Sequence, residues 1–226
     1  MSATDVTRPA RLVLVAGTGT EVGKTWVGAA LLGHWRGLGC RVGARKPAQS
    51  FEAGSGPTDA EVLGRASGEP PERVCSPHRW YPVPMAPPMA AEVLGRPPFT
   101  VAELAAELSW EPGTDVGLVE GAGGVRSPQA DDGDLCEVGH AIEPDAVVLV
   151  ADAGLGTIAA VRHAVDALAN VPGRIEVVLN RFDPGAELHR RNLDWLRRRD
   201  GLAVTAVDGN AMLALARRLA PMGAAG

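Results

Sequence analysis

A glycine-rich segment between an apolar run and a helical pattern constrains this chain most. Leu12 to Ala16 (LVLVA) has the composition and length of a buried strand. After the segment, apolar residues recur at helical spacing at Val27, Leu31, Trp35 and Leu38, and Gly39 follows as a helix stop. Between them, Gly17 to Thr25 is GTGTEVGKT. A strand, such a loop and a helix are the setting of a phosphate-binding loop, whose amides and helix N-terminus hold phosphate groups.

Within this loop, Lys24 would neutralise the β- and γ-phosphates of a nucleotide, and the Thr25 hydroxyl would bind magnesium. The strict motif has four residues between its first glycine and Gly-Lys, but here Thr18 holds the position of that first glycine and Gly17 lies one residue earlier. The loop is therefore one residue longer than standard. The alternative is a glycine-rich turn that binds nothing, which the strand and helix on either side disfavour.

Apolar runs of strand length alternate with helix-period segments along the rest of the chain. This alternation predicts an α/β fold of the P-loop NTPase class: one domain over residues 1–226, with a doubly wound, mostly parallel sheet flanked by helices. Residues 82–90 (PVPMAPPMA) are expected to be extended because prolines crowd them. The remaining predicted strands are 41–46, 116–120, 146–151, 176–179 and 202–207, and the predicted helices are 59–65, 90–94, 101–108, 158–168, 187–199 and 212–219.

Composition argues against several classes of protein. The net charge of −5 gives no general attraction to nucleic acids or membrane surfaces. The basic run at 190–199 (RRNLDWLRRR) is short and helical, so we expect a solvated face. Three widely spaced cysteines suit neither a zinc site nor a disulfide framework. Every apolar run, the N-terminal one included, is too short for a membrane span or signal peptide, so a cytoplasmic protein without nucleic-acid or membrane partners is expected.

A second motif lies at residues 116–124 (VGLVEGAGG), where Glu120 leaves the end of an apolar strand. Ligands of an α/β sheet gather at the carboxyl ends of its strands, so Glu120 is a candidate magnesium ligand. Its glycines, Gly121, Gly123 and Gly124, permit close backbone approach to phosphate or substrate. A tight turn with a solvated glutamate is about as probable for the motif alone, and the P-loop shifts the balance towards function.

A third segment, 45–50 (RKPAQS), places Lys46 at the end of the second predicted strand. A lysine over the same sheet edge as the P-loop could stabilise negative charge that develops away from the nucleotide. From spacing alone, a surface lysine is the better interpretation. Asp59 follows a Gly/Ser/Pro-rich loop, where Thr58 would be the N-cap of a helix and Asp59 a residue of its first turn.

The combination GTGTEVGKT, KPAQS, TDAEVL, VEGAGG and VLNRF resembles the dethiobiotin synthetase family, in order and from about Val13 to Arg181. The resemblance implies ATP-dependent closure of a cyclic urea. One amine of 7,8-diaminononanoate captures CO2 as a carbamate, and the carbamate attacks the γ-phosphate to form a carbamic–phosphoric anhydride. The second amine then closes the ring. It also implies Mg2+, ATP as co-substrate, and a homodimer whose partner completes the distal end of the substrate site.

The resemblance assigns roles to individual residues. Lys46 and Lys24 are the implied catalytic residues. Lys46, Ser50 and Gly124 are implied to contact the substrate, and Thr25, Asp59 and Glu120 the metal. The implied nucleotide-binding residues are Thr20, Glu21, Val22, Gly23, Lys24, Thr25, Trp26, Asp59, Glu120, Gly121, Ala122, Gly123, Asn180, Arg181, Asp208 and Gly209. Of these, Trp26 fits a core position at least as well.

The chain also departs from the family pattern. Many members carry a lysine where Gly154 stands in DAGLGT, so the substrate carboxylate or phosphate could be held by backbone amides instead. Asp152 in the same turn ranks below Glu120 as a metal ligand. The late segment that packs on the base is AVTAVDGNAM here, with Val207 to Asn210 as the candidate stretch. The preference for a nucleotide base is open.

Three other functions fit parts of the pattern. A ParA/MinD-like switch ATPase shares the fold and the loop but carries a lysine near the loop's start, where this chain has Gly17-Thr18-Gly19. An amidotransferase-type synthetase acting on corrinoid carboxylates carries an added glutaminase domain, for which 226 residues leave no room. A nucleotide-binding module without chemistry would make Lys46 and Ser50 incidental.

Overall fold

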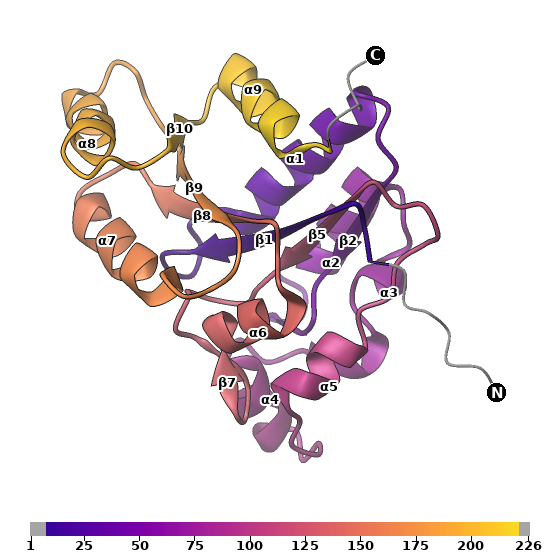
Figure 1. Cartoon of the computed structure of the whole chain (residues 1–226). Coiled ribbons are helices and arrows are strands. Elements are labelled where there is room, and N and C mark those ends of the chain that lie inside the picture. The colour runs from indigo at the N-terminus through magenta and orange to yellow at the C-terminus, as the bar shows by residue number, and fades with distance from the viewer. Residues whose placement is uncertain (1–7, 222–226) are drawn as a thin grey trace.

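A parallel sheet runs through the centre of the molecule (Figure 1). The computed structural model describes residues 8–221, so residues 1–7 and 222–226 lie outside the described residues. Within that range six strands form the sheet in the order β10-β9-β8-β1-β5-β2, and every neighbouring pair is parallel. The predicted doubly wound α/β fold is confirmed.

The order of the strands places the key loops on one edge. β1 (Arg11–Gly17) is paired with β5 (Val116–Glu120) on one side and with β8 (Ala146–Asp152) on the other. Because the strands are parallel, their carboxyl ends lie at the same edge of the sheet. The glycine-rich loop leaves β1 there, and Glu120 ends β5 there.

Two hydrophobic layers cover the sheet, as the alternation of β1 requires. Leu12, Leu14 and Ala16 pack into the layer with α5 (Val101–Ala106), α6 and α7. Val13 and Val15 pack into the opposite layer with α1 (Lys24–Gly37), α2 and α9. Successive residues of a strand point to opposite faces, so a run buried on both faces reads as continuously apolar.

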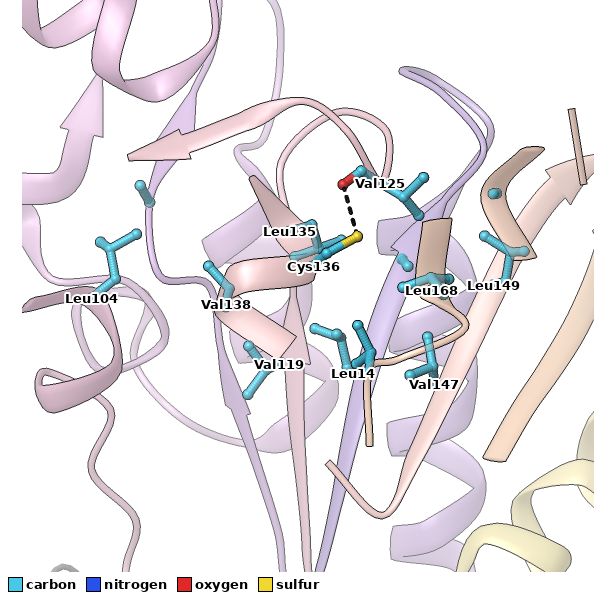
Figure 2. Packing of buried hydrophobic residues seen from close by; sticks show 14 of the residues in the cluster. Leu14, Leu104, Val119, Val125, Leu135, Cys136, Val138, Val147, Leu149 and Leu168 are labelled. Carbon is cyan, nitrogen blue, oxygen red and sulfur yellow. Dashed lines mark hydrogen bonds between the residues drawn. The ribbon is translucent and has the colours of Figure 1, made fainter. Parts of the chain in front are cut away.

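Figure 2 shows part of the first layer, where side chains of α6 (Leu135–Ile142) meet the sheet. Leu135 and Val138 lie in the same cluster as Leu14 and Leu149. The Cys136 thiol is buried and lies 3.9 Å from the Val125 carbonyl oxygen. Cys40, Cys75 and Cys136 are all buried, and they form no disulfide within the described part of the chain.

Within the described residues no further strand pairs with the outer edge of β2 (Val42–Arg45). A side chain and a loop cover this edge instead. The Ala44 amide donates to Glu69 Oε2 at 2.8 Å, and the Lys46 amide donates to the Val74 carbonyl at 2.7 Å. The Arg45 guanidinium meets the other Glu69 oxygen at 2.8 Å. One carboxylate therefore fixes two residues of the strand that precedes Lys46.

The insertion between β2 and β5 departs from the sequence-based prediction. The extended chain predicted for 82–90 is wrong at its end, because α4 (Pro87–Val93) begins inside the proline stretch. Proline suits the first turn of a helix, whose amides lack partners in any case. A short parallel pair, β3 (Gln49–Ser50) with β4 (Trp80–Tyr81), also forms where no strand was predicted.

The helix α6 was not predicted because its apolar pattern is only eight residues long. The predicted elements elsewhere are confirmed with ends shifted by a few residues. The remaining elements are α2 (Asp59–Ser67), α3 (Pro71–Val74), the 3-10 turn η1 (Pro77–Arg79), β6 (Pro128–Ala130), β7 (Gly133–Asp134), α7 (Thr157–Leu168), β9 (Arg174–Asn180), α8 (Glu187–Arg198), β10 (Val204–Ala206) and α9 (Gly209–Leu219).

Candidate functional site

A cavity of about 840 Å³ opens at the carboxyl edge of the sheet. It lies between the glycine-rich loop, the start of α2, and the turns that follow β5 and precede α4. Its lining combines charged, hydroxyl and apolar side chains. The lining residues are Thr20, Glu21, Gly23, Lys24, Thr25, Lys46, Gln49, Ser50, Phe51, Glu52, Ser55, Pro57, Thr58, Asp59, Pro84, Met85, Ala86, Pro87, Ala122, Gly123, Ser127, Pro128 and Arg181.

The glycine-rich loop has the backbone of a phosphate cradle. Gly23 caps α1 with φ of 93°, a left-handed conformation that favours glycine. A β-carbon there would lie 2.0 Å from Asn180 Nδ2, so the position also excludes larger residues on steric grounds. Lys24 Nζ donates back across the loop to the Gly19 carbonyl at 3.0 Å. The loop is thus closed upon itself at the N-terminus of a 14-residue helix.

Lys46 lies at the centre of a buried charge cluster. Its Nζ is 2.7 Å from Asp59 Oδ2 and 2.7 Å from Glu120 Oε1, and it donates to the Gly121 carbonyl at 3.2 Å. The side chains of Lys46 and Glu120 are 2% and 0% exposed. The three N–H groups of the ammonium therefore have three protein acceptors.

The electrostatic environment shifts the pKa values of these groups in different directions. Burial alone would lower the pKa of Lys46, but attraction to Asp59 and Glu120 outweighs it and raises this pKa. The positive charge of Lys46 lowers the pKa of Asp59. Burial raises the pKa of Glu120 against the pull of Lys46. Burial, with repulsion from Lys46, lowers the pKa of Lys24 to about 8.

Thr25 joins the two carboxylates of this cluster. Its Oγ1 lies 2.9 Å from Asp59 Oδ1 and 2.9 Å from Glu120 Oε1. Glu120 Oε2 is buried and has no hydrogen-bond partner within residues 8–221. That range holds no group of three or more His, Cys, Asp or Glu side chains arranged for a metal. The protein therefore offers one hydroxyl and two carboxylates, a hard oxygen set that suits Mg2+ with retained water and phosphate oxygens.

The turn after β5 is braced by Gln129, which sequence reasoning missed. Gln129 Oε1 accepts the Ala122 amide at 2.9 Å, and its Nε2 donates to the Ala122 carbonyl at 2.7 Å and to the Ser127 carbonyl at 3.0 Å. A β-carbon on Gly124 would lie 3.3 Å from Gly19 Cα, so the turn packs against the P-loop backbone. This close contact explains on steric grounds why residue 124 is a glycine.

The far side of the P-loop is tied to β9. Asn180 Nδ2 donates to the Val22 carbonyl at 2.9 Å. The Arg181 guanidinium donates to the Glu21 carbonyl at 2.8 Å and to Asp152 Oδ2 at 3.0 Å. Asp152, considered above as a weaker metal candidate, is therefore an ion-pair partner. These bonds set the position of the loop relative to the end of β9.

The structure brings most predicted site residues together, but not all of them. Glu120, Gly121 and Asn180 do not line the cavity. Glu120 and the Gly121 carbonyl bind the lining residue Lys46, whereas Asn180 binds the Val22 carbonyl of the P-loop. Trp26 is 55% exposed on α1, which contradicts the core alternative. Asp208 Oδ1 accepts the Ala211 amide at 2.7 Å, as the N-cap of α9, and Gly209 follows it on the exposed surface. Asp208 therefore caps α9, and Gly209 is the first residue of that helix.

Two further facts about the site were available from composition. The chain has only two lysines, Lys24 and Lys46, and both line the cavity. It also has only two glutamines, Gln49 and Gln129, which are 1% and 3% exposed. Gln49 lies inside the KPAQS segment, so its place beside Lys46 and Ser50 was the signal that could have identified it. No local pattern marks Gln129.

The sequence is similar to those of known proteins over most of its length. A family model described as an AAA domain matches residues 11–207. A Rhodococcus jostii protein named ATP-dependent dethiobiotin synthetase BioD is 37% identical over 201 residues, which are 87% of this chain and 83% of that protein. Its namesake in Anaeromyxobacter dehalogenans is 35% identical over 201 residues, covering 86% of this chain and 89% of that protein.

Solved structures share the fold at low sequence identity. A nucleotide-binding protein from Archaeoglobus fulgidus in complex with ADP aligns with a TM-score of 0.53 at 17% identity, over 92% of this chain and 87% of that one. Chloroplast FtsY from Physcomitrella patens aligns with a TM-score of 0.53 at 16% identity, over 95% of this chain and 68% of that one. None of the helices described in residues 8–221 combines the length and apolarity needed to cross a membrane.

Proposed function

Because this chain belongs to the dethiobiotin synthetase family, we propose that it closes the cyclic urea of dethiobiotin from 7,8-diaminononanoate, CO2 and ATP, in biotin biosynthesis. The observation that carries the proposal is the convergence on one cavity of the P-loop Lys24, a second lysine, Lys46, and the Thr25, Asp59 and Glu120 cluster. A simple nucleotide-binding module has no need for a buried second ammonium beside its phosphate loop.

The first step joins the substrate amine to CO2. The nitrogen lone pair of one amine forms a bond to the carbon of CO2, and the nitrogen loses a proton to give a carbamate anion. The cavity is large enough for the diamine beside a nucleotide. Holding both reactants in one cavity removes most of the entropic cost of their encounter.

The second and third steps activate the carbamate and close the ring. A carbamate oxygen attacks the γ-phosphorus, the bond to ADP breaks, and a carbamic–phosphoric anhydride results. The second amine then attacks the carbonyl carbon, loses a proton, and expels inorganic phosphate. Phosphoryl transfer depends mainly on alignment and on neutralising charge on the phosphoryl oxygens. Lys24 on the P-loop, and Lys46 from the end of β2, supply that charge from two directions.

Magnesium is part of the proposal. Thr25, Asp59 and Glu120 would hold it, because they form a hard oxygen cluster in which Glu120 Oε2 is buried without a hydrogen-bond partner in the described range. When bound, the ion would supply positive charge to the β- and γ-phosphates. Lys46 itself lies between the two carboxylates and keeps them from repelling one another.

The ParA/MinD-like alternative is less well supported. The signature lysine of that class would stand near the start of the loop, but this chain has no lysine besides Lys24 and Lys46. The difference is observable, because a switch ATPase would hydrolyse ATP faster when DNA or lipid vesicles are added. We expect no such stimulation and no hydrolysis in excess of dethiobiotin formed.

The deciding measurement is product formation by the purified protein. Diaminononanoate, bicarbonate, magnesium and each of the four common nucleoside triphosphates are supplied, and the cyclic urea is detected by mass spectrometry. Dethiobiotin formed only when all components are present supports the proposal and reveals the nucleotide preference. A protein that binds triphosphate at the loop but makes no cyclic urea contradicts it.

Replacement of Lys46 by alanine tests the role of the second lysine. We expect the turnover rate to fall by about 100-fold or more, because a preorganised charge at the reacting group is lost, while nucleotide affinity changes little. Arg65→Ala, which removes an exposed charge on α2, is the matched control and should leave turnover unchanged. Unchanged turnover in the Lys46 variant would refute its proposed role.

A further inference from the structure

One wall of the cavity depends on two very short strands. β3 ends at Ser50 and continues into Phe51, and both residues line the cavity. β4 ends at Tyr81, which pairs with Ser50 and whose carbonyl accepts the Phe51 amide at 3.0 Å. The chain after β4 reaches the cavity again at residues 84–87. Residues 50, 51 and 84–87 form the β3–β4 wall. A pair of two-residue strands is marginal by itself, so contacts outside the pair must fix this wall.

An arginine–aromatic cluster, formed by Arg79, Tyr81, Arg96 and Phe99, supports β4. The rings of Tyr81 and Phe99 are stacked, with centroids 6.0 Å apart and an interplanar angle of 7°. The guanidinium carbon of Arg96 lies 5.0 Å from the Tyr81 centroid, and that of Arg79 lies 4.3 Å from the Phe99 centroid. Each buried ring therefore has a cation over its face, which is an attractive arrangement that strengthens when water is excluded.

Hydrogen bonds join this cluster to the backbone of two other segments. Arg96 Nη1 donates to the Trp80 carbonyl of β4 at 2.8 Å. The Phe99 amide donates to Asp131 Oδ2 at 2.9 Å, and the Asp131 amide donates to the Phe99 carbonyl at 3.1 Å. Asp131 directly follows β6, whose first residue, Pro128, lines the cavity. The cluster thus connects β4 with the chain on the other side of the cavity mouth.

Arg79 fixes the opposite end of the cluster. Its guanidinium makes two hydrogen bonds to the Glu107 carboxylate, from Nε to Oε2 at 3.0 Å and from Nη2 to Oε1 at 2.6 Å. Glu107 is the C-cap of α5, so this ion pair ties the 3-10 turn before β4 to that helix. The Arg79 side chain is 9% exposed, and bidentate pairing restricts its orientation. None of the four cluster residues is among those that line the cavity.

We propose that the arginine–aromatic cluster holds the β3–β4 wall against the aliphatic chain of the diamine, which makes Arg79 and Arg96 positioning residues for the reaction. The inference rests on the function proposed above. Apart from Ser50, the β3–β4 wall is apolar, which suits methylene groups, whereas a triphosphate needs the amides and cations of the P-loop. A displaced wall should therefore weaken diamine binding and leave nucleotide binding intact.

Replacement of Arg96 by leucine tests this role. Arg96 is only half-buried, and its hydrogen bonds go to carbonyl groups, so its loss leaves no carboxylate unpaired. We expect KM for the diamine to rise by about tenfold, because a small displacement of a contact surface is costly. The value of kcat and the nucleotide affinity should stay within about twofold of wild type. Arg96→Lys keeps a cation for the Tyr81 ring and a donor for the Trp80 carbonyl, so it should reverse most of the rise.

Arg197→Leu is the matched control for a general loss of stability. Arg197 donates two hydrogen bonds to the Val204 carbonyl, at 3.0 Å and 2.7 Å, and Val204 begins β10 at the other edge of the sheet. Urea denaturation measures the stability of each variant. The control should leave KM for the diamine unchanged, even where its stability falls as far as that of Arg96→Leu.

The outcomes separate this inference from the proposed function. A selective rise in KM for the diamine that lysine reverses supports the positioning role. Three results would overturn it while wild-type protein still makes dethiobiotin: an unchanged KM in Arg96→Leu, an equal rise in Arg197→Leu, or an equal loss of nucleotide affinity. Wild-type protein that makes no dethiobiotin would overturn the proposed function, and this inference with it.

Discussion

At the residue scale, Gly23 shows how tightly the P-loop is fitted to its surroundings. Its φ of 93° and the 2.0 Å approach of Asn180 Nδ2 to a hypothetical β-carbon leave no room for a side chain. We expect Gly23→Ala to lower the free energy of unfolding by about 1–3 kcal/mol and to abolish nucleotide binding, because backbone strain and a displaced Asn180 add together. Urea denaturation and nucleotide titration measure the two effects.

Gly33→Ala is the control for this substitution. Gly33 lies within α1, the helix that Gly23 caps, and nothing is within 4 Å of the β-carbon that alanine would add. Alanine there should raise stability by about 0.5–1 kcal/mol, since glycine is a poor helix former. Equal effects at 23 and 33 would show that the P-loop conformation does not depend on this glycine.

The sequence motifs were sufficient to predict where some of the candidate site residues lie. Lys24 and Thr25 follow from a loop between a strand and a helix, and Glu120 from the end of a buried strand. Gln49 and Gln129 were missed because their roles depend on backbone groups distant in sequence. Gln49 meets Ala60, 11 residues away, and no periodicity announces such a pair.

At the element scale, the strand that carries Lys46 depends on Glu69. This carboxylate holds the Ala44 amide and the guanidinium of Arg45, whose side chain is 4% exposed. We expect Glu69→Gln to lower the free energy of unfolding by about 3 kcal/mol, because it leaves a buried guanidinium without its counter-charge. Turnover should fall as well, because Lys46 directly follows β2.

Urea denaturation and steady-state kinetics check this prediction. Glu72→Gln, at an exposed carboxylate on α3, is the matched control and should change the free energy of unfolding by less than about 0.5 kcal/mol. A Glu69 variant as stable as the control would mean that the ion pair adds nothing to the edge of the sheet.

Elements with a strong period were predictable, and elements fixed by tertiary contacts were not. The buried run at 146–151 and the helix at 158–168 are long enough for their apolar pattern to distinguish a strand from a helix. β3 and β4 have two residues each and exist only because they pair with one another. The start of α4 was missed because two prolines favour extended chain and a first helical turn equally.

At the scale of the whole molecule, the alternation of elements predicted the fold class, but not the order of the strands. β5 lies between β1 and β2, so the chain crosses to the edge strand before it fills the gap. Apolar patterns give each strand two buried faces, but do not state its neighbours. The order nevertheless decides the geometry of the candidate site, since it places Glu120 beside Thr25 of the P-loop.

A homodimer is the prediction that belongs to this scale. Leu155, in the turn before α7, is 92% exposed, so a second copy that packed there would gain from burying its side chain. We expect sedimentation to give twice the mass of one chain, and Leu155→Asp to weaken association and raise KM for the diamine. Leu188→Asp on α8, at another exposed leucine, is the control. A fully active monomer would refute a shared substrate site.

Because both lysines lie in the cavity, the remaining surface of the protein offers no lysine side chain that a reactive intermediate could modify. A carbamic–phosphoric anhydride is an acylating agent, and a neutral side-chain amine is the group that it would modify most readily. The other basic side chains of this chain are 20 arginines and five histidines, and the guanidinium stays protonated and poorly nucleophilic. Under the proposed mechanism, anhydride that left the cavity would meet no further lysine side chain of this chain, and water would become its main target.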